Sequence, residues 1–197
     1  MPSRIEHVRR GDAADGSVNE LLREAEEGWY GDAAFFGVMA HQPTLLERIV
    51  SVFRVFPQSE QLSPETLELM RLKIADLHRC AYCATVRTVS VRDDVSPKEE
   101  AVFGKIDSGP LTRREELAVR LAEGMSTDPH RITDEFFDEL RAAFDDATLI
   151  ELLLFVSLEI GLDRFCIALT LDTTEESRYP SGLEYPFERS QAGPGTD

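Results

Sequence analysis

The chain has 197 residues, 42% of them hydrophobic, so it is long enough for one domain with a full core or for two fused small repeats. Its formal net charge of −16 argues against nucleic-acid binding, because the phosphate backbone would be repelled and no basic cluster compensates. No run of about 18 apolar residues is present and the N-terminal segment lacks an apolar signal region, so we expect a cytoplasmic protein without a membrane span.

Helical periodicity runs through most of the chain, whereas the alternation typical of strands is nearly absent. Residues 1–16 are expected to form an N-terminal arm, and Ser17 with Glu20 makes a capping box that starts the first helix. Ser63 followed by Pro64 starts a later helix, with a core stripe of Leu67, Met70, Ile74 and Leu77. Further helix starts are expected at Thr112 with Glu115, at Thr133, and at Asp145 or Asp146.

These patterns predict an all-α fold with a helical domain over residues 17–172 and an extended tail over residues 173–197. The tail aromatics are expected to pack against the body or a neighbouring subunit, and the last seven residues are expected to be disordered. A weak internal repeat at an offset of 83 relates residues of about 30–90 to residues 112–172. In this alignment Cys166 corresponds to Cys83, whereas Asp163 corresponds to Cys80.

Cys80 and Cys83 are the residues best suited to a redox reaction. Two cysteines at i and i+3 where a helix begins lie within disulfide reach, and the helix N-terminus favours the thiolate, which is the reactive form. The run from Val86 to Val91 is expected to continue the helix that Cys80 opens. Two alternatives remain: a pair of buried structural cysteines, or half of a zinc site with His78 as a third ligand.

Glu68 precedes Cys80 by twelve residues, which is roughly 18 Å along a continuous helix and too far for contact. A helix break near His78 and Arg79 would bring the carboxylate towards the thiols. There it could accept a proton from one sulfur or orient another group. The alternative is an exposed helical glutamate, which is the usual environment of this residue.

The segment from Leu62 to Cys83 resembles the active-site signature of the alkylhydroperoxidase D (AhpD) and carboxymuconolactone decarboxylase family, whose core is Glu-x11-Cys-x-x-Cys-x3-His. The similarity covers residues of about 30 to 172. It implies an all-helical fold, homo-oligomers, and peroxide reduction in which Cys83 attacks, Cys80 resolves the sulfenic acid and Glu68 belongs to a proton relay. It implies no organic cofactor and no metal, and a lipoyl protein or another dithiol as the reductant.

The chain departs from this signature at Arg87, which stands where the family has histidine. Arginine stays charged and cannot act as a base, although it could pair with Glu68 and lower the pKa of Cys83. His78 or His41 is a possible substitute for the histidine. Separately, we expect Cys166 to be a buried, inert thiol, and Arg164 to form ion pairs with its carboxylate neighbours, Asp163 and Glu159.

Three functions are therefore compatible with the sequence. The first is a thiol-dependent peroxidase, or related dithiol oxidoreductase, that uses Cys80 and Cys83. The second is a decarboxylase of the carboxymuconolactone type, which needs no paired thiols. The third is a non-catalytic oligomeric scaffold or redox sensor that retains the cysteine pair without the relay histidine.

Overall fold

The computed structural model describes residues 3–56, 61–179 and 183–188, and these residues form helices, turns and extended segments but no β-strand. The predicted all-α fold is therefore confirmed. No helix within these ranges is long and apolar enough to cross a membrane. The predicted disorder of the last seven residues concerns positions that lie outside the described ranges.

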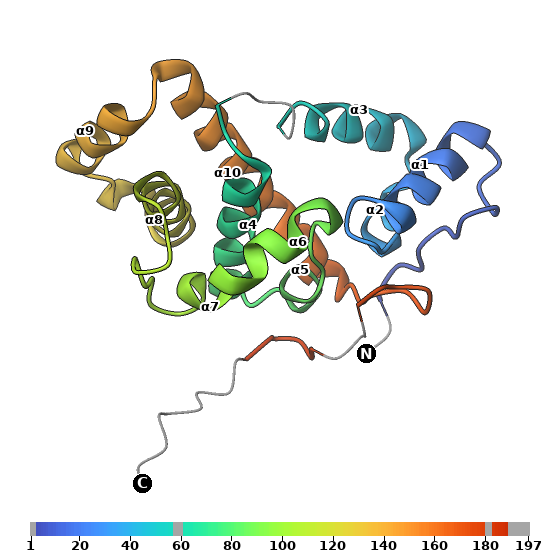
Figure 1. Cartoon of the computed structure of the whole chain (residues 1–197). Helices are drawn as coiled ribbons and strands as arrows, with labels where there is room; N and C mark the ends of the chain where they lie inside the picture. Colours follow the sequence, from blue (N-terminus) through green and yellow to red (C-terminus); the bar gives the residue numbers. More distant parts are fainter. Residues whose placement is uncertain (1–2, 57–60, 180–182, 189–197) are drawn as a thin grey trace, which may run out of the picture.

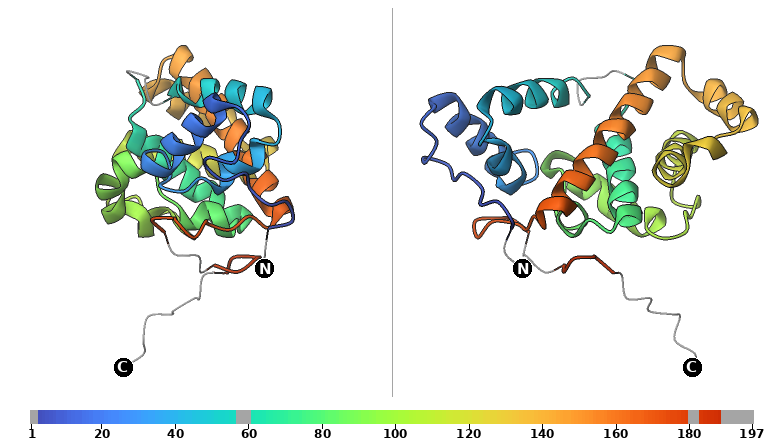
Figure 2. Two further views of the ribbon diagram at one scale, coloured as in Figure 1. Left: turned by 90° about the vertical axis from the view of Figure 1, so that its right-hand side faces the viewer. Right: turned by 180° about the vertical axis from the view of Figure 1, so that it is seen from behind.

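Two helices, α4 (Pro64–His78) and α10 (Asp146–Leu169), pack against each other at the centre of the molecule (Figure 1). The helices on one side of this pair are α1 (Gly16–Glu27), α2 (Ala34–Met39) and α3 (Pro43–Phe53). Those on the other side, which Figure 2 also shows from behind, are α8 (Arg113–Thr127) and α9 (Asp134–Ala143). Short segments complete the chain: α5 (Ala81–Thr85), α6 (Arg92–Val95), α7 (Glu99–Val102), and 3-10 turns at Val89–Val91, Ser96–Lys98 and Pro129–Arg131.

Polar side chains cap four of the predicted helix starts, at Ser63, Thr112, Thr133 and Asp145. The first helix differs from the prediction. Its N-cap is Asp15, whose carboxylate accepts hydrogen bonds from the amide and the hydroxyl of Ser17, both at 2.8 Å. Ser17 therefore lies inside the first turn, and the predicted Ser17–Glu20 capping box is wrong.

The helix that follows Cys80 is shorter than expected. It ends at Thr85, and Val86 adopts an extended conformation with φ −76° and ψ 156°. The β-branched residues after Thr85 have restricted side-chain rotamers in a helix, and two arginines donate hydrogen bonds to the last carbonyls of α5. The prediction that residues 86–91 continue this helix is therefore wrong.

The buried apolar residues form two clusters, one on each side of the central pair. One cluster combines α1, α2 and α3 with α5 and the last turns of α10. The other combines most of α4 with α8, α9 and the first half of α10. The cysteine pair belongs to the first cluster, while the helix that carries Glu68 contributes mainly to the second, so the candidate site lies where the two clusters meet.

The C-terminal segment returns to the body of the molecule after α10. Tyr179 and Phe187 are buried, and the Phe187 amide donates a hydrogen bond to the Arg79 carbonyl at 3.2 Å. Part of the tail therefore packs beside the junction between α4 and α5, next to the cysteine pair.

Candidate active site

A sharp break separates the helix of Glu68 from the helix of the cysteines. Arg79 ends α4 in the left-handed conformation, with φ 57° and ψ 42°, and its amide bonds back to the Asp76 carbonyl. The Cys80 amide bonds to the Ala75 carbonyl, and Cys80 then becomes the N-cap of α5. The break that the sequence predicted near His78 and Arg79 is thus present.

Cys80 and Cys83 form a disulfide across the first turn of α5, with their Cα atoms 5.3 Å apart. The Cys80 sulfur also accepts a hydrogen bond from the Cys83 amide at 3.3 Å. Cys80 is fully buried and its sulfur lies 3.8 Å from the hydroxyl of Tyr185 in the tail, whereas Cys83 retains 7% exposure. Of the two cysteines, Cys83 is therefore the less completely buried residue.

Arg71 joins Glu68 to the cysteine segment. Its guanidinium donates two hydrogen bonds to the Glu68 carboxylate, at 2.6 and 2.8 Å, and one each to the carbonyls of Cys83 and Val86, both at 2.8 Å. Both charged residues are buried, with exposures of 4% for Arg71 and 2% for Glu68. After the break that ends α4, Arg71 thus links the Glu68 carboxylate to the backbone of the cysteine segment.

The hydrogen bonds of Glu68 determine its charge. Burial alone would raise its pKa, but the charge and hydrogen bonds of Arg71 and the hydrogen bonds of Thr88 lower the pKa below its usual value. Glu68 is therefore ionised near neutral pH and already accepts four hydrogen bonds, so it is better suited to fix Arg71 than to take up a proton.

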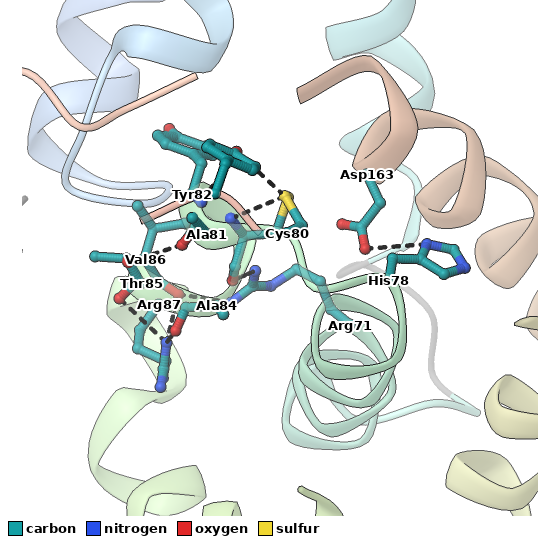
Figure 3. The surroundings of a disulfide bond; sticks show 12 residues. Arg71, His78, Cys80, Ala81, Tyr82, Ala84, Thr85, Val86, Arg87 and Asp163 are labelled. Atoms are coloured by element: carbon teal, nitrogen blue, oxygen red, sulfur yellow. Dashed lines mark hydrogen bonds and ion pairs between the residues drawn. A yellow bond between two sulfur atoms is a disulfide. The ribbon is translucent and has the colours of Figure 1, made fainter. Parts of the chain in front are cut away.

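Arg87 does not make the pairing with Glu68 that the sequence allowed. Its guanidinium forms hydrogen bonds to both carboxylate oxygens of Glu99, at 2.8 and 3.0 Å, and its Nη1 donates to the carbonyls of Ala84, Thr85 and Val86. Figure 3 shows it turned towards these carbonyls and away from Cys80. Arg87 caps the end of α5, and Arg71 holds the position that the sequence suggested for it.

The two candidate substitutes for the relay histidine lie elsewhere. His41 is exposed, with its Nε2 2.8 Å from the Glu6 carbonyl. His78 packs against Asp163, and its Nδ1 lies 3.3 Å from the carboxylate (Figure 3). Asp163 was expected to pair with Arg164, but Arg164 is exposed, and the residue in contact with the Asp163 carboxylate is His78.

Cys166 is closer to the pair than the sequence indicated. It is 1% exposed on α10, and its sulfur lies within 4.8 Å of both other cysteine sulfurs. Burial, together with the charges of Asp163 and Glu159, raises the pKa of this thiol well above its usual value, so it remains protonated. Three sulfurs are one ligand short of a structural zinc site.

Two small cavities lie against these groups. The first, which we call the disulfide cavity, measures about 20 Å³, enough for one water molecule, and Cys83 and Cys166 contribute to its wall. The second, the aromatic cavity, measures about 90 Å³, and its wall combines the rings of Trp29, Tyr30, Phe53, Phe56 and Phe155 with aliphatic residues and with the polar residues Glu68, Arg71, Thr88 and Glu159. Both cavities are bordered by Tyr30, Phe53, Arg71 and Glu159, so they adjoin along these four side chains.

Glu159 is the acidic residue that sequence reasoning placed in a purely structural ion pair. It lies on α10 with 6% exposure. Its pKa is raised to about 8, chiefly because burial disfavours the charged form; the positive charge of Arg71 opposes this rise, and the negative charges of Asp163 and Glu68 contribute to it. Glu159 therefore holds a proton at neutral pH. Its helical spacing from Phe155 and Asp163 was the available signal that it faces the core.

Comparisons with known proteins give relatives without an established function. No protein-family model matches the chain. The uncharacterized protein Rv2313c of Mycobacterium tuberculosis is 29% identical over 131 residues, which cover 62% of this chain and 45% of that protein. The uncharacterized protein YnjA of Escherichia coli is 29% identical over 121 residues, covering 60% of this chain and 66% of YnjA. The chain thus matches about half the length of the Mycobacterium tuberculosis relative.

Several solved structures share the fold. An uncharacterized peroxidase-related protein from Ralstonia eutropha, described as an alkylhydroperoxidase AhpD core, aligns with a TM-score of 0.73 and 17% identity over 89% of this chain and 95% of that one. A peroxidase-related protein from Silicibacter sp. aligns with a TM-score of 0.73 and 16% identity, over 90% and 94%. The debrominase Bmp8 in complex with 2,3,4-tribromopyrrole aligns with a TM-score of 0.74 and 19% identity, over 89% and 94%. The chain therefore has the AhpD-like helical fold.

Proposed function

We propose that the chain is a dithiol oxidoreductase that reduces organic hydroperoxides through Cys80 and Cys83. The observation that carries this proposal is the disulfide between them, with Cys83 as the less buried cysteine and the one that lines the disulfide cavity. The shared fold of peroxidase-related proteins supports an enzyme of this general type.

The proposed reaction begins with the reduced pair. The Cys83 thiolate attacks one oxygen of the hydroperoxide, so an S–O bond forms, the O–O bond breaks and an alcohol leaves once its oxygen is protonated. Cys80 then attacks the sulfenic acid of Cys83, and water leaves as the disulfide forms. An external dithiol, such as a lipoyl protein, returns two electrons and two protons by thiol–disulfide exchange.

In this proposal Arg71, rather than Arg87, favours the Cys83 thiolate. Arg71 borders the disulfide cavity together with Cys83 and is fixed on the Cys83 carbonyl at 2.8 Å. A permanent positive charge near a thiol lowers the thiol pKa. Glu68 is then a positioning residue that orients Arg71, which replaces the proton relay suggested by the family resemblance.

The aromatic cavity supports an organic substrate. Its volume of about 90 Å³ and its ring-lined wall suit an apolar group attached to the peroxide, whereas the disulfide cavity holds only a water-sized group. We therefore propose that the peroxide oxygens enter the disulfide cavity while the organic group occupies the aromatic cavity.

The proposal is tested by following hydroperoxide consumption. Purified protein reduced with dihydrolipoamide is expected to consume cumene hydroperoxide and to form one Cys80–Cys83 disulfide per hydroperoxide. Cys83→Ser should abolish consumption, and Cys80→Ser should stop after one equivalent with a sulfenic acid that a dimedone probe traps. Cys166→Ala is the matched control and should retain activity, since its thiol stays protonated. Absence of consumption with every dithiol, while the pair remains reduced, would reject the proposal.

The other candidate functions have distinct outcomes. Because Bmp8 is described as a debrominase with a bromopyrrole bound, a halogenated aromatic compound is the second candidate substrate, and the aromatic cavity favours it. Bromide release with formation of the same disulfide would support that reaction. Lactone decarboxylation that survives replacement of both cysteines would support the decarboxylase. Reversible disulfide formation without turnover would support a redox sensor.

The proposal also covers the cellular location, the cofactor requirement and the oligomeric state of the enzyme. We place it in the cytoplasm, where thiols are kept reduced. The reaction as written requires no metal and no organic cofactor. We further propose a homo-oligomer, because Ile150, Leu154 and Leu158 expose an apolar stripe at four-residue spacing on α10, with exposures of 58%, 56% and 36%.

A further inference from the structure

The proposed reaction still needs a proton for the leaving oxygen. An alkoxide is a poor leaving group, and a peroxidase must protonate it as the O–O bond breaks. Arg87, which replaces the signature histidine, caps α5 and pairs with Glu99. His41 and His78 contact Glu6 and Asp163 instead. These three residues are thus held by other contacts.

Glu159 lies where such a proton is required. It is in the wall of the disulfide cavity together with Cys83, and it also borders the aromatic cavity that we assign to the organic group. A hydroperoxide bridging the two cavities would pass Glu159 and Arg71 on opposite helices, α10 and α4. Glu159 is only 6% exposed, so its side chain is largely shielded from bulk water.

The charges around Glu159 keep it protonated and still acidic. Its pKa is raised to about 8, chiefly by burial; Arg71 on α4 opposes this rise, whereas Asp163 on the same helix and Glu68 on α4 contribute to it. Tyr30 and Cys166 also face this group, and both stay neutral because burial raises their own pKa values. A general acid is most effective when its pKa lies near the working pH.

We propose that Glu159 is the catalytic acid that protonates the leaving oxygen as Cys83 attacks the hydroperoxide. This inference rests on the proposed peroxidase function. The carboxyl proton moves to the alcohol, and Glu159 recovers a proton when the Cys83 thiol of the next reduced pair ionises. Over one cycle, hydroperoxide and external dithiol give alcohol, water and external disulfide, with no net proton change at the site.

Glu159→Gln tests this assignment, because glutamine matches the size and neutrality of the protonated acid but does not donate its proton. We expect the single-turnover rate of disulfide formation with tert-butyl hydroperoxide to fall by about 10²-fold or more. With peroxyacetic acid the rate should be nearly unchanged, because acetate leaves without protonation. A structural role for Glu159 would slow both substrates equally. Glu151→Gln, two turns earlier on α10 and outside both cavities, is the matched control.

The pH profile provides a second readout. For the wild type, the rate with tert-butyl hydroperoxide should decline as the pH rises through about 8, since the acid form of Glu159 is lost. This alkaline limb should be absent in Glu159→Gln and present in Glu159→Asp, which keeps an acid if the glutamine variant does not fold. Equal losses with both peroxides, or a wild-type profile without the limb, would overturn the assignment. The peroxidase proposal itself fails only if the wild type consumes no hydroperoxide.

Discussion

Arg71 holds a positive charge inside the molecule through directed contacts. It donates to the Glu68 carboxylate and to two backbone carbonyls, and its guanidinium lies 5.2 Å from the centre of the Tyr30 ring. Because both ions are out of water, each depends on the other to offset the loss of hydration. The same contacts that stabilise the pair also fix the peptide that carries Cys83.

Removing either Arg71 or Glu68 alone should lower the stability of the folded protein. We expect Arg71→Met to lower the free energy of unfolding by about 3–5 kcal/mol, because the Glu68 carboxylate remains buried without its partner. Urea denaturation of Arg71→Met, Glu68→Leu and the double variant measures the coupling, and the double variant should cost less than the sum of the single changes. Strict additivity would mean that the two charges do not interact.

The protonation of Glu159 should affect the pH dependence of the free energy of unfolding as well as that of the reaction rate. Its pKa is about 8 in the folded protein and near 4.5 when exposed, so between these values the folded state binds the extra proton and wild-type stability falls as the pH rises. Glu159→Gln lacks this effect. Its stability relative to the wild type should therefore increase by up to ~1.4 kcal/mol per pH unit between pH 5 and 8 and level off beyond. A difference that is constant with pH would contradict the buried acid.

Some residues of this site could be predicted from the sequence, and others could not. Cys80, Cys83 and Glu68 were recognised because their spacing along the chain is itself a signal. Arg71 carried only a weak signal, a charge inside the apolar run of α4. Glu159 is separated from Cys83 by most of the second half of the chain, and only the packing of α10 on α4 brings it to the cavity.

At the scale of the elements, the site depends on a difference between α4 and α10 in where each helix ends. The first helix stops at Arg79 and the chain turns back, whereas α10 continues through the aligned position, Leu162, to Leu169. The break was predictable because Glu68 could not otherwise approach the cysteines. The early end of α5 was not, because it depends on hydrogen bonds from Arg71 and Arg87, whose partners the sequence pattern did not reveal.

Tyr185 in the tail segment lies against Cys80. The Tyr185 hydroxyl accepts a hydrogen bond from the Tyr82 amide at 3.2 Å and lies 3.8 Å from the Cys80 sulfur. We expect Tyr185→Ala to raise the rate of iodoacetamide labelling of Cys80 in the reduced protein severalfold, with little change at Cys83. Tyr185→Phe keeps the ring and is the control. Peptide mass mapping measures both sites, and an unchanged labelling ratio would show that the tail is not a cover.

At the scale of the whole molecule, the site lies at the boundary between the two hydrophobic clusters. Phe53 from the N-terminal cluster and Phe155 from the other both line the aromatic cavity. The sequence predicted the helices that build the second cluster, α4, α8, α9 and α10, because amphipathic periodicity is a local property. The sequence did not predict the boundary between the clusters, because this boundary depends on how α3, α4 and α10 pack together. The internal repeat, which would relate the two halves, stays a prediction.

The exposed apolar stripe of α10 predicts an assembly of several copies. Ile150, Leu154 and Leu158 follow one another at four-residue spacing, and apolar area of this kind is stabilised when a second surface covers it. We expect the wild type to elute as an oligomer in size-exclusion chromatography with light scattering. Leu154→Glu combined with Leu158→Glu should shift it towards monomer, because a buried contact would then place unpaired carboxylates in an apolar interface. Thr127→Glu, at the exposed end of α8, should leave the mass unchanged, whereas a monomeric wild type at micromolar concentration would rule out this interface.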